Sequence, residues 1–400
     1  MKILMLTPYL PYPDSSGGQI RTQNLLKHLK SDHDITLFSL IKDPKEKQYI
    51  PILEKDFCKK VKVFLRSEKP FTFKNVINTA FSLKPFLVVR NFSSDAKKAI
   101  EEELQKGDYD LIHVETFYAM PHIPETDIPV VLVDQTIEYK VYQHYTEKTA
   151  LWPLKPLMYL DVAKLKYWER HYWQKADRAI AVSSQDKEQM LELEPDLDVN
   201  IVPNGVNLDL FKKKTSWKTD SPKLLFIGNF HWLQNTEAAK FLINKVLPKV
   251  KDQLAKAQVH IVGQHQPDDL KELSSDSVVI NELAEDDVQG IVDAYHDSNV
   301  FVAPLFGPGG TRLKTLAAMA SQLPIVSSPV GISGLGIKEN EHALVSEDPD
   351  KMAQYVVQLI QNPQQAEEMA KKSRRFVEKE YSYKSIANKL SNIYQKVANV

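Results

Sequence analysis

The chain has 400 residues, of which 43% are hydrophobic and 26% are charged, and its formal net charge at pH 7 is −1. This length predicts two domains of ordinary size, and the near-neutral balance excludes a nucleic-acid-binding protein with a broad basic face. The single cysteine, Cys58, excludes a disulfide framework and a zinc finger. No apolar run reaches about 18 residues, and the apolar start is too short for a signal peptide, so we expect a cytoplasmic protein.

Short apolar runs alternate with amphipathic helical stretches along the chain, which is typical of parallel sheets covered by helices on both faces. Strands are predicted at residues 3–6, 35–40, 61–65, 111–114, 130–133, 179–182 and 199–202, and again at 223–228, 259–262, 278–281, 300–303, 325–327 and 343–345. A polar segment without a period follows Asn204-Gly205 and marks the domain boundary. The sequence therefore predicts an α/β protein with two Rossmann-like domains, residues 1–205 and 206–382. A helix at about 383–400 is expected to pack back on the first domain.

The first predicted strand leads into a proline-rich loop that ends in Gly17 and Gly18, before a helix that carries Arg21. This loop lacks the Gly-x-Gly-x-x-Gly spacing of dinucleotide-binding proteins, which disfavours a nicotinamide-dependent enzyme. Two interpretations remain open. The loop is either an ordinary strand-to-helix turn or a lid over a cleft between the two domains.

The fourth predicted strand ends in two polar residues, His113 and Glu115, which alternation along a strand places on one face. His113 is either a buried structural histidine or a site residue. Glu115 is either a plain polar strand end or a site residue. The next strand ends at Asp134-Gln135, which we expect on the same side of the domain.

Two Asp-x-Asp runs, at 108–110 and 196–198, precede predicted strands and are interpreted as turn residues rather than metal ligands. Two other segments, 69–90 and 151–173, are rich in aromatic and basic residues. They either pack as aromatic helices in the core or between the domains, or rest on an anionic membrane surface.

The most informative stretch is Gly309-Gly310-Thr311-Arg312-Leu313-Lys314, which follows a predicted strand and opens a predicted helix. Glycines allow a ligand to approach the backbone, and the free N–H groups of a helix start attract anions. Arg312 and Lys314 add two cations at the same place. These features together predict a site for an anion, most simply a diphosphate.

These segments, in their order along the chain, resemble glycosyltransferase family 4 with the two-domain GT-B architecture, in which the two sheets face a central cleft. The similarity is carried by residues 1–29, 176–183, 202–207, 260–263, 301–305 and 309–320, and residues 226–235 resemble a subgroup of polysaccharide-forming sugar transferases. The resemblance implies retaining transfer of a sugar from a nucleoside diphosphate donor to a glycan or lipid-linked acceptor. It implies neither a cofactor nor a metal ion.

The resemblance also assigns roles to individual residues. Arg312 and Lys314 would stabilise the departing diphosphate, because Asn229 and Asn235 stand where many relatives carry cations. His113 and Glu115 would lie near the transferred sugar, where Glu115 would bind a sugar hydroxyl or help to deprotonate the acceptor. The donor would contact residues of both domains, namely Gly17, Gly18, Gly228, Asn229, Gly309, Gly310, Thr311 and Ala317.

One departure from the family pattern is important. Many relatives carry a Glu-x7-Glu pair that binds the sugar and the ribose, and this chain has Gly309 and Ala317 at those positions. Losing a charged acceptor of ribose hydrogen bonds costs about 1.5–3 kcal/mol of donor binding. Two alternatives to an active transferase therefore remain: a non-catalytic paralogue that binds nucleotide sugars, and a nucleotide-sugar epimerase on the same fold.

Overall fold

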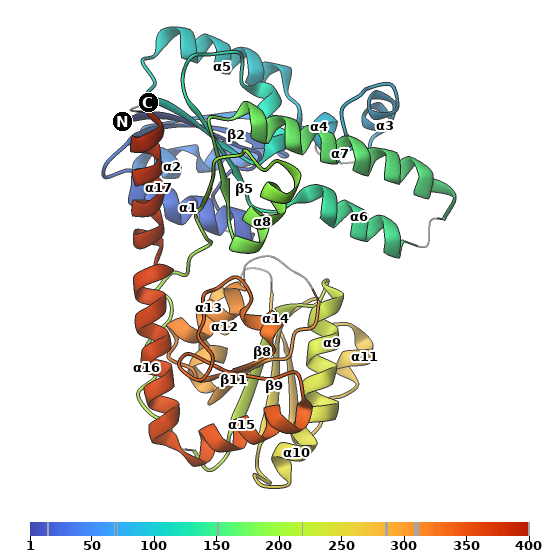
Figure 1. The fold of residues 1–400 in the computed structure, drawn as a ribbon, viewed down its shortest axis with the longest axis vertical. Helices are drawn as coiled ribbons and strands as arrows, with labels where there is room; N and C mark the ends of the chain where they lie inside the picture. The colour runs from blue at the N-terminus through green and yellow to red at the C-terminus, as the bar shows by residue number, and fades with distance from the viewer. Residues whose placement is uncertain are drawn as a thin grey trace. The chain divides into compact units, whose positions relative to one another are not determined.

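The computed structural model describes residues 1–13, 16–67, 69, 71–149, 152–217, 219–284, 287–307 and 312–398. The chain divides into two compact units (Figure 1). Unit 1 consists of Met1–Pro203 and Ile386–Val400, and unit 2 consists of Asn204–Ser385. The second boundary falls inside the last helix, α17 (Tyr383–Ala398), so most of that helix belongs to unit 1. Among the described residues, no helix combines the length and apolar character needed to span a bilayer.

Unit 1 is built on a parallel sheet with the strand order β3-β2-β1-β4-β5-β6-β7, in which β1, β2, β4, β5 and β6 are largely buried. The strands are β1 (Lys2–Thr7), β2 (Asp34–Ile41), β3 (Lys60–Leu65), β4 (Leu111–Glu115), β5 (Val130–Asp134), β6 (Arg178–Ala181) and β7 (Val199–Ile201). The helices are α1 (Gly17–Leu29), α2 (Ile50–Asp56), α3 (Phe73–Ala80), α4 (Phe86–Asn91), α5 (Ser94–Lys106), α6 (Glu138–Lys148), α7 (Lys155–Lys175) and α8 (Ser184–Leu193), with 3₁₀ turns at Pro44–Tyr49, Phe117–His122 and Trp152–Leu154.

Unit 2 contains a second parallel sheet, with the strand order β10-β9-β8-β11-β12-β13. Its strands are β8 (Lys223–Asn229), β9 (Gln258–Gln264), β10 (Val278–Glu282), β11 (Val300–Ala303), β12 (Ile325–Ser327) and β13 (Leu344–Val345). Its helices are α9 (Leu233–Phe241), α10 (Leu247–Lys251), α11 (Asp268–Lys271), α12 (Val288–Asp297), α13 (Leu313–Ala320), α14 (Pro329–Ile332), α15 (Pro349–Gln361) and α16 (Pro363–Glu380), with a π-helical turn at Leu242–Val246. Each strand that the sequence predicts is present, and the α/β fold class is confirmed.

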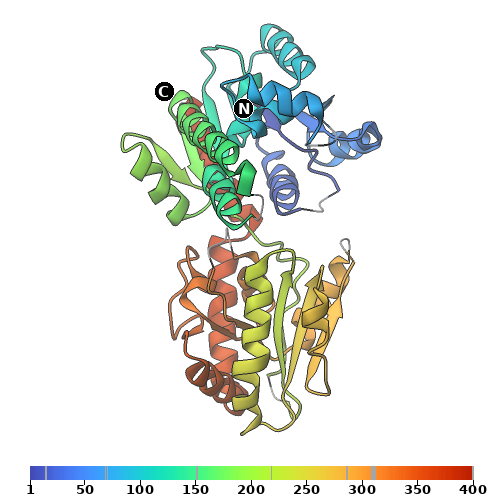
Figure 2. The same cartoon turned by 90° about the vertical axis from the view of Figure 1, so that its right-hand side faces the viewer.

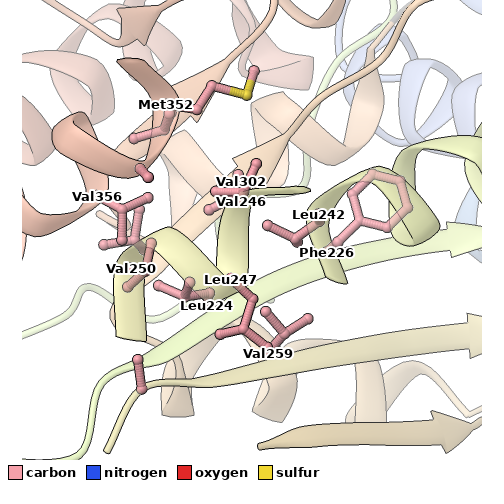
Figure 3. Close-up of a cluster of buried hydrophobic side chains, with 14 of the residues drawn as sticks. Leu224, Phe226, Leu242, Val246, Leu247, Val250, Val259, Val302, Met352 and Val356 are labelled. Atoms are coloured by element: carbon pink, nitrogen blue, oxygen red, sulfur yellow. The ribbon is translucent and has the colours of Figure 1, made fainter. Parts of the chain in front are cut away.

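Alternation along β8 shows why helices cover both faces of the second sheet (Figure 2). Leu224 and Phe226 point into the cluster shown in Figure 3, where they meet Leu242 and Met352. The intervening residue Leu225 points into a separate cluster with side chains of α12 and α13. Both faces of a buried parallel strand must be apolar, which makes its sequence a continuous apolar run.

In unit 1, the buried guanidinium group of Arg21 in α1 holds the backbone at the end of the segment Met1–Pro203. Its two terminal nitrogens donate hydrogen bonds to the carbonyl oxygens of Pro203 and Val202, at 2.6 and 2.9 Å. Helix α17 is held by buried polar contacts as well. The Ser391 hydroxyl lies 2.8 Å from His33 Nε2, and the Tyr394 hydroxyl lies 2.6 Å from His113 Nδ1.

Gly228 and Gly263 face each other where β8 and β9 end. Gly263 has a φ of +145°, and a Cβ there would lie 1.8 Å from the carbonyl oxygen of Gly228. Gly336 also has a positive φ, of +62°, but a Cβ there would meet only Phe376 at 3.7 Å.

We expect Gly336→Ala to cost about 1 kcal/mol of unfolding free energy. Gly263→Ala should cost about 4 kcal/mol or more, because the backbone must move as well.

Calorimetric unfolding of the two variants checks this prediction. Equal losses of stability in Gly263→Ala and Gly336→Ala would contradict the close approach of the two strands.

Candidate functional site

In unit 2, the ammonium group of Lys314 lies at the carboxyl end of β8, although Lys314 belongs to the first turn of α13. Its Nζ donates to Asn235 Oδ1 at 2.7 Å and lies 4.7 Å from the centre of the Phe226 ring. Asn235 is oriented in turn by a hydrogen bond of 2.6 Å from its Nδ2 to the carbonyl oxygen of Asn229. Gly228 makes this approach possible, because a Cβ there would lie 3.1 Å from Nζ and 2.9 Å from Asn235 Cγ.

The environment of Lys314 disfavours its charge. Burial, and then repulsion from Arg312, lower the pKa of the ammonium group to about 7. Its hydrogen-bond acceptor is a neutral amide, and no described carboxylate forms an ion pair with it. This cation is therefore arranged so that an anionic ligand would stabilise its protonated form.

Arg312 is the other cation expected at this site, and its side chain is hydrogen-bonded to backbone carbonyl groups. Its Nε donates to the carbonyl oxygen of Val330 at 3.0 Å, and a terminal nitrogen donates to that of Gly307 at 3.1 Å. The guanidinium is buried, and burial lowers its pKa. These hydrogen bonds of Arg312 are therefore made to the backbone that follows β11 and β12.

The remaining residues expected to contact the donor are placed only in part. Gly309, Gly310 and Thr311 lie outside the described residues. Ala317 is 7% exposed and packs in the apolar cluster beneath α13, so it offers no polar atom to a ligand. Asn229 ends β8, where its Oδ1 accepts the backbone N–H of His231 at 3.0 Å.

In unit 1, His113 and Glu115 do share a face of β4, but both side chains are buried. Glu115 is 1% exposed. Its Oε1 lies 3.1 Å from His113 Nε2, and its Oε2 accepts the Gln135 amide at 2.7 Å. Burial alone would raise the pKa of the Glu115 carboxyl. Hydrogen bonds from His113 and Gln135 and the charge of Arg21 outweigh burial and lower it.

This pair belongs to a longer buried chain of polar groups. The amide of Gln135 also donates to the Tyr9 hydroxyl at 2.8 Å, and that hydroxyl lies 3.2 Å from Thr22 Oγ1. At the other end, Tyr394 of α17 contacts His113. The structure therefore links α17, β4, the end of β5 and α1 through hydrogen bonds.

The two loop glycines of unit 1 differ in what surrounds them. A Cβ on Gly18 would lie 2.7 Å from the Tyr9 hydroxyl and 3.1 Å from Gln135 Oε1, whereas nothing lies within 4 Å of a Cβ on Gly17. Gly18 therefore provides room for the buried polar chain. Gly17 begins α1 next to its N-cap residue, Ser16.

Asp134, which ends β5, is a second buried carboxylate. It accepts the backbone N–H of Phe117 at 2.8 Å and the indole N–H of Trp173 at 2.5 Å. Burial raises its pKa to about 7.

Thr116, just before Phe117, has a φ of +71°, which is strained for a β-branched residue. The strain is held where β4 ends, at the edge of the sheet that carries ligands in open α/β folds.

Sequence reasoning missed the contributions of Tyr394, Trp173 and Tyr9. Tyr394 is 281 positions from its partner His113, and no motif signals that contact. The two Asp-x-Asp runs lie in turns: Asp110 accepts the backbone N–H of Lys2, and Asp198 pairs with Arg178. The described residues contain no group of three or more His, Cys, Asp or Glu side chains with metal-site geometry.

Comparisons with known proteins cover both units. Residues 15–210 match the model for glycosyltransferase family 4, and residues 221–362 match the model for glycosyl transferases group 1. An uncharacterized 44.6 kDa protein in the cps region of Klebsiella pneumoniae is 22% identical over 399 residues, which cover 96% of this chain and 97% of that protein. A phosphatidyl-myo-inositol mannosyltransferase of Mycobacterium leprae is 22% identical over 313 residues, covering 77% of this chain and 79% of that enzyme.

Solved structures share the fold. Sucrose-phosphate synthase from Thermosynechococcus elongatus has a TM-score of 0.70 at 18% identity, covering 99% of this chain and 98% of that one. HepE from Anabaena, solved in complex with UDP-glucose, has a TM-score of 0.64 at 13% identity, covering 99% of this chain and 100% of that one. The GT-B architecture, two Rossmann-like parallel-sheet units, is thereby established for this chain.

The lowered pKa of Lys314 predicts how stability depends on pH. Between about pH 7 and 10 the unfolded chain holds a proton on Lys314 that the folded chain has released. Unfolding free energy should therefore rise with pH across this window, by at most about 1.4 kcal/mol per pH unit. Lys314→Met should remove that part of the slope, whereas Lys245→Met, which removes an exposed lysine of the same unit, should keep it. Chemical denaturation at several pH values measures the slope, and parallel curves for wild type and Lys314→Met would refute the assignment.

Proposed function

The chain belongs to glycosyltransferase family 4, and we propose that it transfers a sugar with retention of configuration from a nucleoside diphosphate sugar to a glycan or lipid-linked acceptor. In this proposal unit 2 binds the donor and unit 1 holds the acceptor, and the product contributes to a cell-surface polysaccharide. The observation that carries the proposal is the Lys314 ammonium group, held by Asn235 beside Gly228 with its charge uncompensated. The resemblance of residues 226–235 to polysaccharide-forming sugar transferases supports the choice of product.

The chemistry follows from the leaving group. Cleavage of the sugar–phosphate bond leaves an additional negative charge on the diphosphate, and stabilising that charge lowers the barrier. A cation in a partly buried site acts more strongly on it than a cation in water does. Lys314 takes up a proton when the diphosphate binds, and its charge then faces the departing group. Arg312, which donates hydrogen bonds to the carbonyl oxygens of Val330 and Gly307, adds a second positive charge.

Ala317 favours one alternative, a nucleotide-sugar-binding protein without transferase activity. Its buried methyl group cannot accept a hydrogen bond from ribose, so donor affinity depends more heavily on the diphosphate. The two functions differ in turnover. A transferase consumes the nucleotide sugar when an acceptor is present, whereas the alternative protein binds the donor and leaves it intact.

Proton uptake on donor binding tests the site. We expect one member of a panel of UDP-, GDP-, ADP- and dTDP-sugars to bind the full chain. Binding at pH 8 should take up most of one proton, because the diphosphate raises the lowered pKa of Lys314. Calorimetric titrations in buffers of different ionisation enthalpy measure the uptake. Lys314→Met should lose the uptake and weaken binding about tenfold to a hundredfold.

Lys245→Met serves as the control for this experiment, since it removes an exposed lysine without touching the site. Donor binding that is equally tight in Lys314→Met and in wild type would overturn the placement of the diphosphate.

We also propose that unit 1 rests on an anionic membrane surface through an apolar surface formed by residues 71–83 and α6–α7. Phe81, Leu83 and Phe71 are 90%, 85% and 82% exposed, and Trp152 is exposed as well. The segment is ordered: Lys164 Nζ of α7 donates to the carbonyl oxygens of residues 79 and 82, at 3.0 and 2.7 Å. Helices α6 and α7 pack on each other, and α3 packs on α4 (Figure 1). Residues 69–90 contain basic and no acidic side chains, which favours anionic lipid.

The aromatic side chains of the segment 151–173 are buried in part and exposed in part. Trp173 and Tyr172 are core residues, while the aromatic side chains nearer the start of α7 are exposed. Phe81→Ser combined with Leu83→Ser should reduce binding to phosphatidylglycerol vesicles about tenfold or more, because it removes buried apolar contact with lipid. Co-sedimentation measures this, with Leu233→Ser as a control at an exposed leucine of unit 2. Binding that is unchanged in the double variant, or equal on phosphatidylcholine, would exclude this surface.

A further inference from the structure

Three basic side chains of unit 1, Lys42, Arg66 and Arg90, converge beyond the carboxyl ends of β2 and β3. The two strands pair in parallel with Ile41 opposite Leu65, so Lys42 and Arg66 are the next residues on neighbouring strands. The backbone N–H of Arg66 donates to the carbonyl oxygen of Ile41 at 3.0 Å and keeps the two chain segments together.

Asn91 holds the guanidinium group of Arg66, and Phe86 orients that of Arg90. The side-chain oxygen of Asn91 accepts a hydrogen bond from a terminal nitrogen of Arg66, and its Nδ2 donates to the carbonyl oxygen of Leu87 at 2.7 Å. Arg90 precedes Asn91 in α4 and lies over the ring of Phe86, at 5.8 Å from its centre. These contacts orient both arginines before any ligand binds, which reduces the entropic cost of binding.

The charges of the three side chains are not matched by protein carboxylates. No ion pair joins Lys42, Arg66 or Arg90 to an acidic side chain among the described residues. The Nε atoms of both arginines are buried and have no hydrogen-bond partner. Unsatisfied buried N–H donors are costly in a folded protein, and a ligand with several acceptor oxygens would satisfy them.

Among the described residues, the titratable groups that act on this cluster include Glu46, Glu138 and Tyr118. Glu46 uses one oxygen to accept the backbone N–H groups of Lys42 and Asp43, at 2.8 and 2.9 Å. Burial, and then the charge of Asp134, raise the pKa of Glu138 to about 7, so it carries only part of a charge at neutral pH. The pKa of Lys42 is lowered by burial and then by Arg66 and Arg90, as expected where like charges converge.

We propose that Lys42, Arg66 and Arg90 form a subsite for a phosphoryl group carried by the acceptor. Guanidinium groups bind phosphate oxygens through paired N–H donors, and three cations match a dianion or trianion better than a single carboxylate. The position agrees with the general location of ligands at the carboxyl ends of parallel strands. The acceptor assignment rests on the proposed function, whereas binding of the anion to unit 1 does not.

Titration of inorganic diphosphate into the full chain tests both points separately. We expect two binding events in wild type, one at this subsite and one at Lys314. Arg66→Gln combined with Arg90→Gln should weaken the first event about tenfold to a hundredfold and leave the second unchanged. Lys314→Met should do the reverse. If wild type shows the event at this subsite but none at Lys314, the proposed donor site is rejected and this inference stands. Diphosphate binding in the double variant that equals wild type would reject the inference.

Two further variants keep the test decisive if the double variant folds poorly. Lys42→Gln changes an exposed side chain that holds no structural hydrogen bond among those described, so it should weaken the first event without lowering thermal stability. Lys55→Gln is the matched control, since it removes an exposed lysine of neighbouring α2. Equal diphosphate affinity in Lys42→Gln and Lys55→Gln would count against the subsite.

The carrier of the phosphoryl group is distinguished by two soluble probes, farnesyl diphosphate and glucose 1-phosphate. Both should compete with inorganic diphosphate for the first event. A stronger effect of farnesyl diphosphate assigns a lipid diphosphate, and a stronger effect of glucose 1-phosphate assigns a sugar phosphate. Competition by neither probe would overturn the acceptor role.

Discussion

The hydrogen bond between Lys314 and Asn235 is the interaction on which the chemistry of unit 2 depends. Lys314 belongs to the start of α13, and this bond holds its ammonium group beside the end of β8, where Gly228 leaves room for it. The opposite contact, between Gly228 and Gly263, keeps β8 and β9 close at the same place. Gly228 and Gly263 therefore shape the site by leaving room for side chains and backbone of the protein itself, independently of any contact with a ligand.

Unit 1 uses the same edge of its sheet differently. The carboxyl ends of β4 and β5 carry acidic groups that are buried and hydrogen-bonded, among them Glu115 and Asp134. The chain of contacts from Tyr394 to Tyr9 joins the last helix to the first loop, and buried polar networks of this kind specify one arrangement of their elements. The carboxyl ends of β2 and β3 carry cations that no carboxylate of the described residues pairs with. One sheet edge thus combines a rigid acidic region with a basic region suited to an anion.

Both units therefore hold cations that form no ion pair within the described parts of the chain. In unit 2 the charge suits the diphosphate of a sugar donor, and in unit 1 it suits a phosphoryl group on the acceptor. An acceptor with a lipid diphosphate would also account for the exposed apolar surface beside α3 and α7. The three features are separate observations, and each has its own measurement.

The sequence by itself determined the fold class, the positions of the strands and the family. Parallel strands buried on both faces need continuous apolar runs, and such runs are visible without a structure. The sequence also identified Lys314 as a candidate, because the glycine-rich motif is a local pattern, whereas Asn235 appeared there only as a position where many relatives carry a cation. The tertiary structure decided what depends on long-range contacts. It joined Lys42 to Arg66 and Arg90, and it buried Trp173 while exposing Phe81. Composition and periodicity do not encode these outcomes, since electrostatic and packing partners far apart in sequence meet only when the chain folds.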